Sequence, residues 1–317
     1  MSINILPDDV LLEIFDHYVI RRQILSNRTD VDAWHTLVHV CQRWRYVVFD
    51  SPRRLDLRLR CTYRTPVTNM LDIWPALPIV ISNANQPGGS GVTNIISALQ
   101  QHNRVCTIDI ENVPHSLLKE FAAMQEPFPA LTNLELELWS SDENAPVLPD
   151  SFLGGSAPRL RSLELNGIPF PGLPKLLLST HDLVTLRLWR ITRSGYISPE
   201  AMVTALSTLT SLEELVLQFW SPRSQAQRAS RRPPPLTRVV LPALKSLMFR
   251  GDSEYLEDIV SRLEAPLLSY TEITFFNQLV FDTPLLCHFI SHTEIVRAAY
   301  QAYILCDTNT VLFCLYP

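Results

Sequence analysis

Glycine, charged residues and long apolar runs are all scarce in this chain of 317 residues. Only 9 residues are glycine and 19% are charged, whereas 46% are hydrophobic, which excludes a disordered chain. No apolar run approaches the roughly 18 residues that a membrane-spanning helix needs, so we expect no membrane segment. The 24 prolines indicate many short, stiff connections between packed elements.

Cysteine is present but follows no pattern. The chain has six cysteines, and they form neither a C-x-x-C pair nor a regular framework. Together with the absence of a signal peptide, this favours reduced thiols in an intracellular protein of the cytoplasm or the nucleus.

Acidic residues outnumber basic ones, and they are unevenly spread. The whole chain has 32 Asp or Glu against 27 Lys or Arg, a net charge of −5. Residues 1–66, in contrast, hold eight Asp or Glu and ten Lys or Arg. The acidic excess therefore lies in the rest of the chain. Because binding to nucleic acid depends on neutralising phosphates, we expect no nucleic-acid partner.

The first fifty residues carry two helical patterns. Pro7 suits the first position of a helix, and Asp8 and Asp9 suit the positive end of its dipole. One apolar face follows, with Leu11, Ile14, Phe15 and Tyr18. After a polar loop over residues 21–32, the second pattern is apolar around much of its circumference, with Trp34, Leu37, Val40, Cys41, Trp44, Val47 and Val48. A module of roughly 45 residues cannot bury that much apolar surface alone, so we expect a protein partner.

These residues resemble the F-box motif. The resemblance is carried by the strings Leu6-Pro7-x-x-Val10-Leu11-Leu12-x-Ile14-Phe15 and Val40-Cys41-x-x-Trp44-Arg45. In that family a three-helix module docks onto a Skp-type adaptor, which links it to a cullin–RING ubiquitin ligase. By position, the resemblance implies these adaptor-binding residues: Leu6, Pro7, Leu11, Ile14, Phe15, Val40, Cys41 and Trp44. The loop is longer than usual and the tryptophan that often closes the motif is missing near Leu55, so a helical cap without a partner is the alternative.

From about residue 100 one frame recurs, apolar-x-x-apolar-x-apolar. Its copies are Val105/Ile108/Ile110, Leu131/Leu134/Leu136, Leu160/Leu163/Leu165, Leu183/Leu186/Leu188, Leu212/Leu215/Leu217 and Leu244/Leu247/Phe249. They are 23 to 32 residues apart, within and slightly above the usual range of leucine-rich repeats. Each frame predicts a short strand, and a degraded copy is expected at Leu267/Tyr270, where Glu272 breaks the pattern.

Helical patterns fall between the frames. They cover residues 92–101, 115–125, 173–179, 198–209, 252–263 and 284–292. Each strand–helix unit has an apolar side that only a neighbouring unit can cover, so the units are expected to stack into a solenoid. The fold class is thus α/β. This part resembles leucine-rich repeats, and an F-box followed by repeats resembles the F-box/LRR family of fungal type; an ordinary α/β domain with a parallel sheet is the alternative.

The frames lack one feature of regular leucine-rich repeats. Three residues after the last frame position, the usual Asn or Cys is replaced by Val113, Trp139, Ile168, Ile191, Trp220 and Asp252. We therefore expect an irregular solenoid. The predicted parts are an F-box-like module at 1–50, a connector with atypical first repeats at 51–100, and the solenoid at 101–317 with a basic, Pro-rich insertion at 221–235. The chain ends in a strand-like pattern at 311–317.

The outward positions of the predicted strands give a candidate client-binding surface. Alternate side chains of a strand point to opposite faces, so half of them face away from the core. Along the solenoid these positions carry five acids and then an Arg–Trp pair: Asp109, Glu111, Glu135, Glu137, Glu164, Arg187 and Trp189. An acidic stripe beside an exposed tryptophan suits a basic client segment with an apolar anchor. Alternatively, the acids only keep the solenoid soluble.

No motif indicates an active site. The Gly-rich residues 87–91 precede a helical pattern, as a phosphate loop does, but lack the lysine of a Walker motif, which favours a flexible connector. The pairs His35/His39 and His288/His292 have helical spacing, but neither supplies the three or four ligands of a zinc site. We therefore expect no enzyme activity, no metal and no cofactor.

Together these patterns predict a substrate-recognition subunit of a ubiquitin ligase. Its F-box would bind a Skp-type adaptor, and through it a cullin, while the repeats hold an unknown client protein. Such a protein supplies proximity and no chemistry. The alternative is a ligase-independent repeat scaffold whose N-terminal helices only cap the solenoid and expose no apolar face. An enzyme on a repeat scaffold would need a polar cluster in a deep pocket, which the sequence does not indicate.

Overall fold

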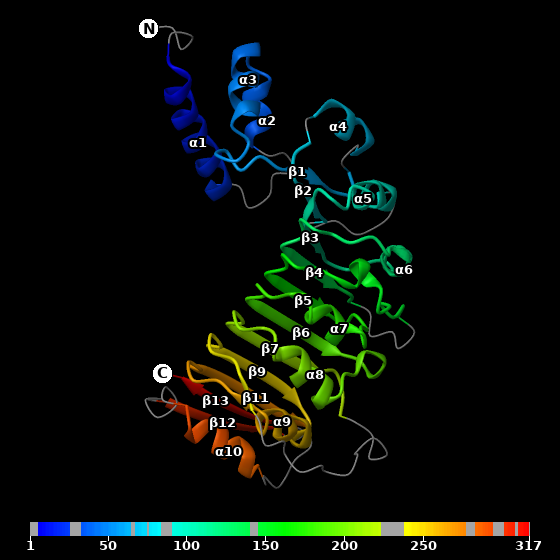
Figure 1. Cartoon of the computed structure of the whole chain (residues 1–317), viewed down its shortest axis with the longest axis vertical. Helices are drawn as coiled ribbons and strands as arrows, with labels where there is room; N and C mark the ends of the chain where they lie inside the picture. Colours follow the sequence, from blue (N-terminus) through cyan, green and yellow to red (C-terminus); the bar gives the residue numbers. More distant parts are fainter. Residues whose placement is uncertain are drawn as a thin grey trace. The chain divides into compact units, whose positions relative to one another are not determined.

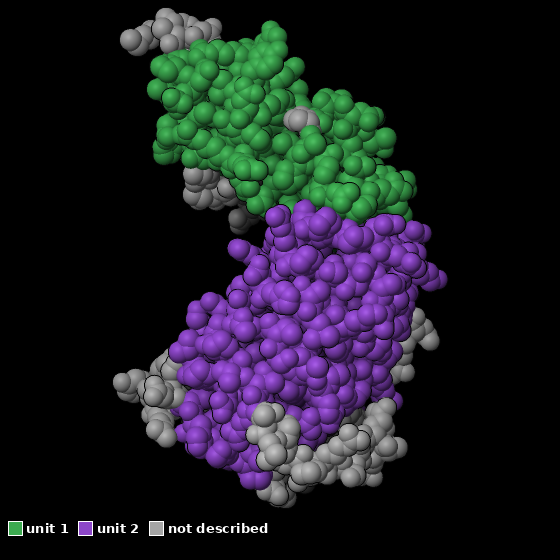
Figure 2. All heavy atoms as spheres, in the orientation of Figure 1, with its two compact units in different colours: residues 1–110 green, residues 111–317 purple. Residues whose placement is uncertain are grey.

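The protein forms two compact units, residues 1–110 and residues 111–317 (Figure 2). The structure, a computed structural model, describes residues 6–25, 33–64, 67–74, 76–83, 91–139, 145–222, 238–276, 283–293, 301–307 and 310–316. The predicted boundaries at residues 50 and 100 both lie inside the first unit. Most of the predicted insertion at 221–235 and of the Gly-rich residues 87–91 lies outside the described residues.

Three helices begin the first unit: α1 (Asp8–Leu25), α2 (Ala33–Val38) and α3 (Gln42–Asp50) (Figure 1). α1 starts directly after Pro7 and has Asp8 and Asp9 in its first turn, as the sequence predicts. It continues to Leu25, so the prediction of a loop from Arg21 onward is wrong for its first five residues. The cause is that polar composition alone does not end a helix, because arginine and glutamine are good helix formers.

The second predicted helix is two helices, which corrects the single helix expected from Trp34 to Val48. The chain leaves the helical path after Val38, and Cys41 adopts an extended conformation with φ −159° and ψ 169°. The Arg45 Nε donates to the carbonyl oxygen of Val38 at 3.1 Å, which satisfies a free carbonyl at the end of α2. The apolar pattern runs through the break because both helices contribute to the same core.

The core of the three helices is built from the predicted apolar faces. Leu11, Phe15 and Val19 are buried on α1, and Val47 and Val48 are buried on α3. Each such side chain stabilises the fold by about 1.5–3 kcal/mol when it is fully buried. The ring of Phe15 lies 4.7 Å from the ring of Trp44 between centroids, so α1 and α3 are packed directly together.

Parallel strands and helices alternate in the rest of the first unit. The strands are β1 (Leu59–Cys61), β2 (Ile79–Ser82) and β3 (Val105–Ile110), and the helices are α4 (Val67–Ile73) and α5 (Val92–Leu99). β1 pairs with β2 and β2 with β3, each in parallel. β1 begins only at Leu59, because Asp56 has a positive φ of 46° that interrupts the extended chain before it.

The second unit repeats this alternation, so the predicted α/β class is confirmed (Figure 1). Its parallel strands are β4 (Asn133–Glu137), β5 (Ser162–Asn166), β6 (Thr185–Ile191), β7 (Glu214–Phe219), β9 (Ser246–Gly251) and β11 (Tyr270–Phe276). Its helices are α6 (His115–Ala123), α7 (Leu173–Leu177), α8 (Pro199–Leu206), α9 (Ser253–Val260) and α10 (Pro284–Ser291). Two 3₁₀ turns, η2 (Phe152–Gly155) and η3 (Arg193–Gly195), and a small parallel pair, β8 (Val239–Val240) with β10 (Leu263–Glu264), complete the connections.

The frame residues stand in register across this sheet. The last frame position of each strand pairs with the next: Leu136, Leu165, Leu188, Leu217, Phe249 and Ile273. The degraded frame predicted at Leu267/Tyr270 is wrong by one residue, because Leu268, Thr271 and Ile273 are the buried positions and Leu267 is exposed. Thr271 hid this copy, because its polar side chain takes the place of a leucine.

An antiparallel hairpin follows the parallel strands. The predicted C-terminal strand is β13 (Thr310–Tyr316), which pairs antiparallel with β11 and with β12 (Gln301–Asp307). The sequence gives no prediction for β12. Among the described residues, every helix is too short or too polar to cross a membrane.

Candidate functional site

The structure divides the predicted adaptor-binding residues into two groups. Leu11 and Phe15 are completely buried in the helical core, so their contribution is structural. Pro7 and Cys41 are exposed, and Ile14 and Val40 keep 41% and 56% of their surface accessible. Leu6 and Trp44 are half-buried.

One exposed residue of this surface was missed by the sequence pattern. Val10 is 41% exposed and lies one helical turn before Ile14, on the same side of α1. Pro7 precedes Val10 by three residues and continues the row. We call Pro7, Val10 and Ile14 the apolar row of α1. The signal that could have found Val10 is the spacing 7, 10, 14 beside the buried spacing 11, 15, 19.

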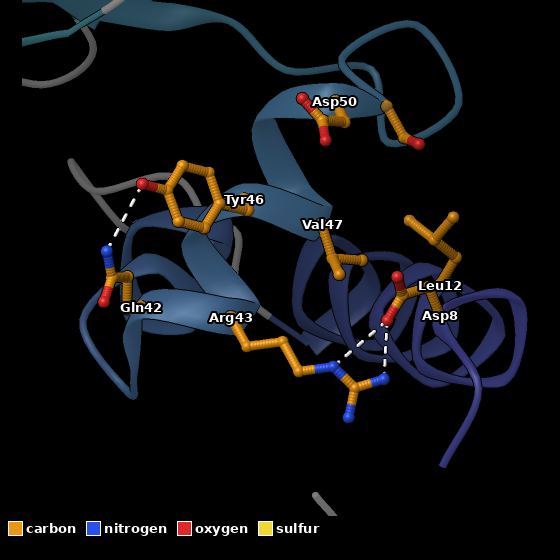
Figure 3. A pocket seen from close by; sticks show the side chains of 8 residues that line it. Asp8, Leu12, Gln42, Arg43, Tyr46, Val47 and Asp50 are labelled. Carbon is orange, nitrogen blue, oxygen red and sulfur yellow. Dashed lines mark hydrogen bonds and ion pairs between the residues drawn. The ribbon is translucent and has the colours of Figure 1, made fainter. Parts of the chain in front are cut away.

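An arginine joins the start of α1 to the start of α3. Arg43 donates to one carboxylate oxygen of Asp8, with the Nη2 atom 2.6 Å and the Nε atom 3.1 Å away, and also to the carbonyl oxygen of Leu6 (Figure 3). Because Val40 and Cys41 come directly before α3, this ion pair holds the turn between α2 and α3 close to the beginning of the apolar row. The exposed apolar residues of both segments therefore belong to one end of the helical module.

A hollow of about 460 Å³ is lined by residues of both α1 and α3 (Figure 3). Leu12 and Val47 are buried residues at its base, and Tyr46 is a wall residue that is 60% exposed. The ion pair of Asp8 and Arg43 lines it as well. None of the predicted adaptor-binding residues lines this hollow, so it is distinct from the apolar row.

The two histidines of α2 and of the turn after it pack against aromatic rings. The ring centroids of His35 and His39 lie 5.2 and 5.9 Å from that of Trp74, and His35 lies 3.9 Å from Trp34. The Nε2 atom of His35 is buried without a hydrogen-bond partner among the described residues. Burial, and to a smaller degree the nearby His39, lower the pKa of His35 below its usual value. Within the described part of the chain, no group of three possible metal ligands occurs.

On the sheet of the second unit, Arg187 occupies the middle of the predicted client surface. Its guanidinium donates to both carboxylate oxygens of Glu214, at 2.9 and 2.8 Å, and to Glu164 at 3.2 Å. The hydrogen bonds that Arg187 donates to Glu214, and then the one to Glu164, raise the pKa of Arg187 above its usual value against the opposing effect of burial. A cation therefore already neutralises this stretch of the predicted acidic stripe.

A second arginine crosses three strands. Arg190 sits in a bulge of β6, where the pairing with β7 shifts between Leu188 and Ile191, and its φ is +50°. This unusual conformation sends the guanidinium back across β5, where it donates to Asn166 and, at 2.6 Å, to the carbonyl oxygen of Leu138. Its Nη2 atom also lies 3.5 Å from Glu137.

The glycine beneath this arginine leaves the room that the crossing needs. Gly167 has a φ of +71°, and a Cβ placed on it would lie 2.9 Å from the carbonyl oxygen of Leu138 and 3.7 Å from the guanidinium of Arg190. Any larger residue would displace the acceptor or the arginine. Gly167 therefore fixes the path of Arg190 from β6 to β4.

The predicted acidic stripe is engaged with the protein itself. Glu137 and Glu164 pair with arginines, and Asp109, Glu111 and Glu135 each interact with other groups of the chain. Asp109 belongs to the first unit and the other acids to the second. Trp189 is half-buried, and its indole nitrogen has no hydrogen-bond partner among the described residues.

Two other tryptophans are more exposed than Trp189 of the predicted client surface. Trp139 follows β4 and is 66% exposed, and Trp220 follows β7 and is 52% exposed. Both stand three residues after the last frame leucine, and the guanidinium carbon of Arg190 lies 5.9 Å from the centre of the Trp220 ring. The sequence marks these positions only as departures from the asparagine of regular repeats.

No protein-family model matches the sequence, and no curated protein matches it.

Proposed function

We propose that this protein is a substrate-recognition subunit of a cullin–RING ubiquitin ligase. Residues 3–50 would form an F-box that binds a Skp-type adaptor, and the later strand–helix units would form an irregular leucine-rich-repeat solenoid that binds a client. The observation that carries the proposal is the apolar row of α1: Pro7, Val10 and Ile14 remain exposed although the same helix buries Leu11 and Phe15 completely.

The apolar row supports a docking surface because nothing in the fold requires apolar residues at its exposed positions. α1 buries Leu11 and Phe15 completely, whereas Val10 and Ile14 each keep 41% of their surface accessible, so polar side chains at these two positions would reach solvent. Apolar side chains that are rimmed by charged neighbours and left accessible are characteristic of protein interfaces. Val40, 56% exposed at the turn held by Arg43, adds to the same end of the module.

The register of the strands supports the solenoid. Each strand–helix unit places one frame residue beside that of the next unit, and the residues of this row from Leu136 to Ile273 are almost completely buried. Such a unit cannot bury its own apolar side, and stacking is what covers it. The client would then be held by the side chains that face away from this core.

The contribution of such a protein to ubiquitin transfer is proximity. A client bound to the repeats would be tethered to the adaptor and the cullin, which raises the effective concentration of its lysines at the charged enzyme. Arg187 and its two carboxylates are fully engaged with one another, which suits a rigid recognition surface better than acid–base chemistry.

The alternative proposal is a ligase-independent repeat scaffold. In that case the N-terminal helices would only cap the repeats and would expose no apolar face. The exposure of Val10, Ile14 and Val40 favours the adaptor-binding proposal over this alternative.

Co-expression with a Skp-type adaptor followed by size-exclusion chromatography tests the proposal. The variant Val10→Asp/Ile14→Asp changes two exposed side chains of α1, so the fold is retained while the row loses its apolar character. We expect co-elution of the native chain with the adaptor and loss of co-elution in this variant.

A matched control adds the same two charges elsewhere in the first unit. The variant Thr68→Asp/Asn69→Asp alters two exposed residues of α4 and should co-elute as the native chain does. Co-elution of the α1 variant, or a native chain that elutes alone, folded and monomeric, would reject the adaptor-binding proposal and leave the scaffold.

A further inference from the structure

The C-terminal ends of β4 to β7 carry an aromatic edge, defined here as Trp139, Arg190 and Trp220. Arg190 reaches from its place in β6 to the carbonyl oxygen of Leu138, the residue before Trp139, and its guanidinium carbon lies 5.9 Å from the Trp220 ring. One side chain thus links the main chain beside Trp139 to the indole of Trp220. Main-chain hydrogen bonds continue the connection, because Leu138 donates to Asn166, Gly167 donates to Trp189 and Trp220 donates to Ile191.

Among the described residues, Arg190 of this edge and Arg187 on the same strand are both paired inside the protein. Arg190 is engaged by Glu137, Asn166 and a carbonyl oxygen, and Arg187 by Glu164 and Glu214. A partner that binds through opposite charges would have to break these pairs. The edge is therefore complementary to an uncharged segment, which differs from the basic segment that the acidic stripe predicts.

The indoles specify more than a general apolar surface. An indole offers a wide flat face for stacking and one N–H that donates a hydrogen bond but accepts none. Proline has the complementary properties, since its ring is compact and apolar, it has no backbone N–H to satisfy, and its carbonyl oxygen is an exposed acceptor in an extended segment.

We propose that the aromatic edge binds a proline-rich, extended segment of the client, with one proline on Trp139 and another on Trp220. Neighbouring strands lie about 4.8 Å apart, and three strand steps separate β4 from β7, so the backbones that carry the two indoles stand roughly 14 Å apart. A polyproline II helix rises about 3.1 Å per residue, so the two anchoring prolines are four or five residues apart. The proposal rests on the proposed function because it assigns the proline-rich segment to the client. Binding of such a segment to the aromatic edge does not require the adaptor.

Titration of the full-length chain alone with decaproline tests the proposal, with an alternating Gly-Ser decapeptide as the control probe. Binding is read from the intrinsic tryptophan emission and by calorimetry. We expect saturable binding of decaproline and none of the control peptide. Trp139→Ala and Trp220→Ala should each weaken binding about tenfold, as expected for an aromatic anchor at the centre of an interface.

Tyr46→Ala is the matched control, because Tyr46 is 60% exposed but belongs to the first unit. It should bind decaproline as the native chain does. Trp139→Phe and Trp220→Phe keep an aromatic ring but lose the N–H donor, so we expect binding about threefold weaker than native. If circular dichroism shows that an alanine variant is misfolded, the phenylalanine variants still test the aromatic edge.

Native-like binding in the tryptophan variants, an equal loss in Tyr46→Ala, or no saturable binding of decaproline would overturn the proposal. Because the adaptor is absent from this titration, these outcomes do not bear on adaptor binding. Loss of adaptor co-elution likewise leaves the aromatic edge untouched.

Discussion

Replacing Arg187 by methionine would reveal how much of the second unit's stability depends on charge pairing between strands. The substitution keeps most of the aliphatic stem but removes the guanidinium from between Glu164 on β5 and Glu214 on β7. A charge-assisted hydrogen bond contributes about 1.5–3 kcal/mol when buried, and an exposed ion pair about 0.2–1 kcal/mol. Because the Arg187 side chain is 37% exposed, solvent screening brings the sum of its bonds to about 2 kcal/mol.

Urea denaturation followed by far-ultraviolet circular dichroism measures this loss as a lower midpoint at unchanged slope. Arg161→Met is the control, because Arg161 is exposed just before β5, and its free energy of unfolding should change by less than about 0.5 kcal/mol. The triple variant Arg187→Met/Glu164→Gln/Glu214→Gln should recover about half of the loss, because it removes the carboxylates left without a counter-ion. An Arg187→Met midpoint equal to that of the control, or no recovery in the triple variant, would refute the reasoning.

Two further predictions concern other buried polar groups. Glu257 is buried and accepts hydrogen bonds from the backbone N–H groups of Leu285 and Leu286, at 3.1 and 2.7 Å, at the start of α10. Glu257→Gln should therefore lower the free energy of unfolding by about 2 kcal/mol, with Glu264→Gln, at an exposed residue, as the control. Equal hydrogen-exchange protection of α10 in the two variants would contradict this prediction. Because the pKa of folded His35 is lowered, the unfolded chain takes up its proton first, so stability is unaffected above about pH 6.5 and falls as the pH drops below that value. In the variant His35→Phe, the urea midpoint should depend less on pH between pH 7.5 and 5.5 than it does in the native chain. The same pH dependence in both proteins would exclude His35 as the cause.

The strands and helices were predictable because their signals are local. A frame such as Leu163 and Leu165 lies within one strand, and Ser198 caps α8 by accepting the N–H of Ala201 three residues on. The failures are also local in origin. Thr271 took a core position with a polar side chain, and the apolar run through Val40 concealed the break between α2 and α3.

The surface chemistry was less predictable because it depends on contacts between distant residues. Arg190 meets Glu137 across 53 residues of chain, and Arg187 meets Glu214 across 27. Strand alternation correctly places Glu137 and Glu164 on the face away from the core, but it says nothing of which cation will lie between them. The acids therefore looked available in the sequence, although the structure pairs them.

The strained backbone of Arg190 links this pairing to the aromatic edge. A positive φ is costly for a residue with a long side chain, and such residues persist where the surrounding structure requires them. Here the requirement is specific, because without the bulge in β6 the guanidinium would not turn back over Gly167 towards the carbonyl oxygen of Leu138. The same bulge brings Arg190 to the Trp220 ring. Strain at one residue thus fixes Arg190 between the main chain beside Trp139 and the ring of Trp220, and such order would reduce the entropy lost in the binding that we propose.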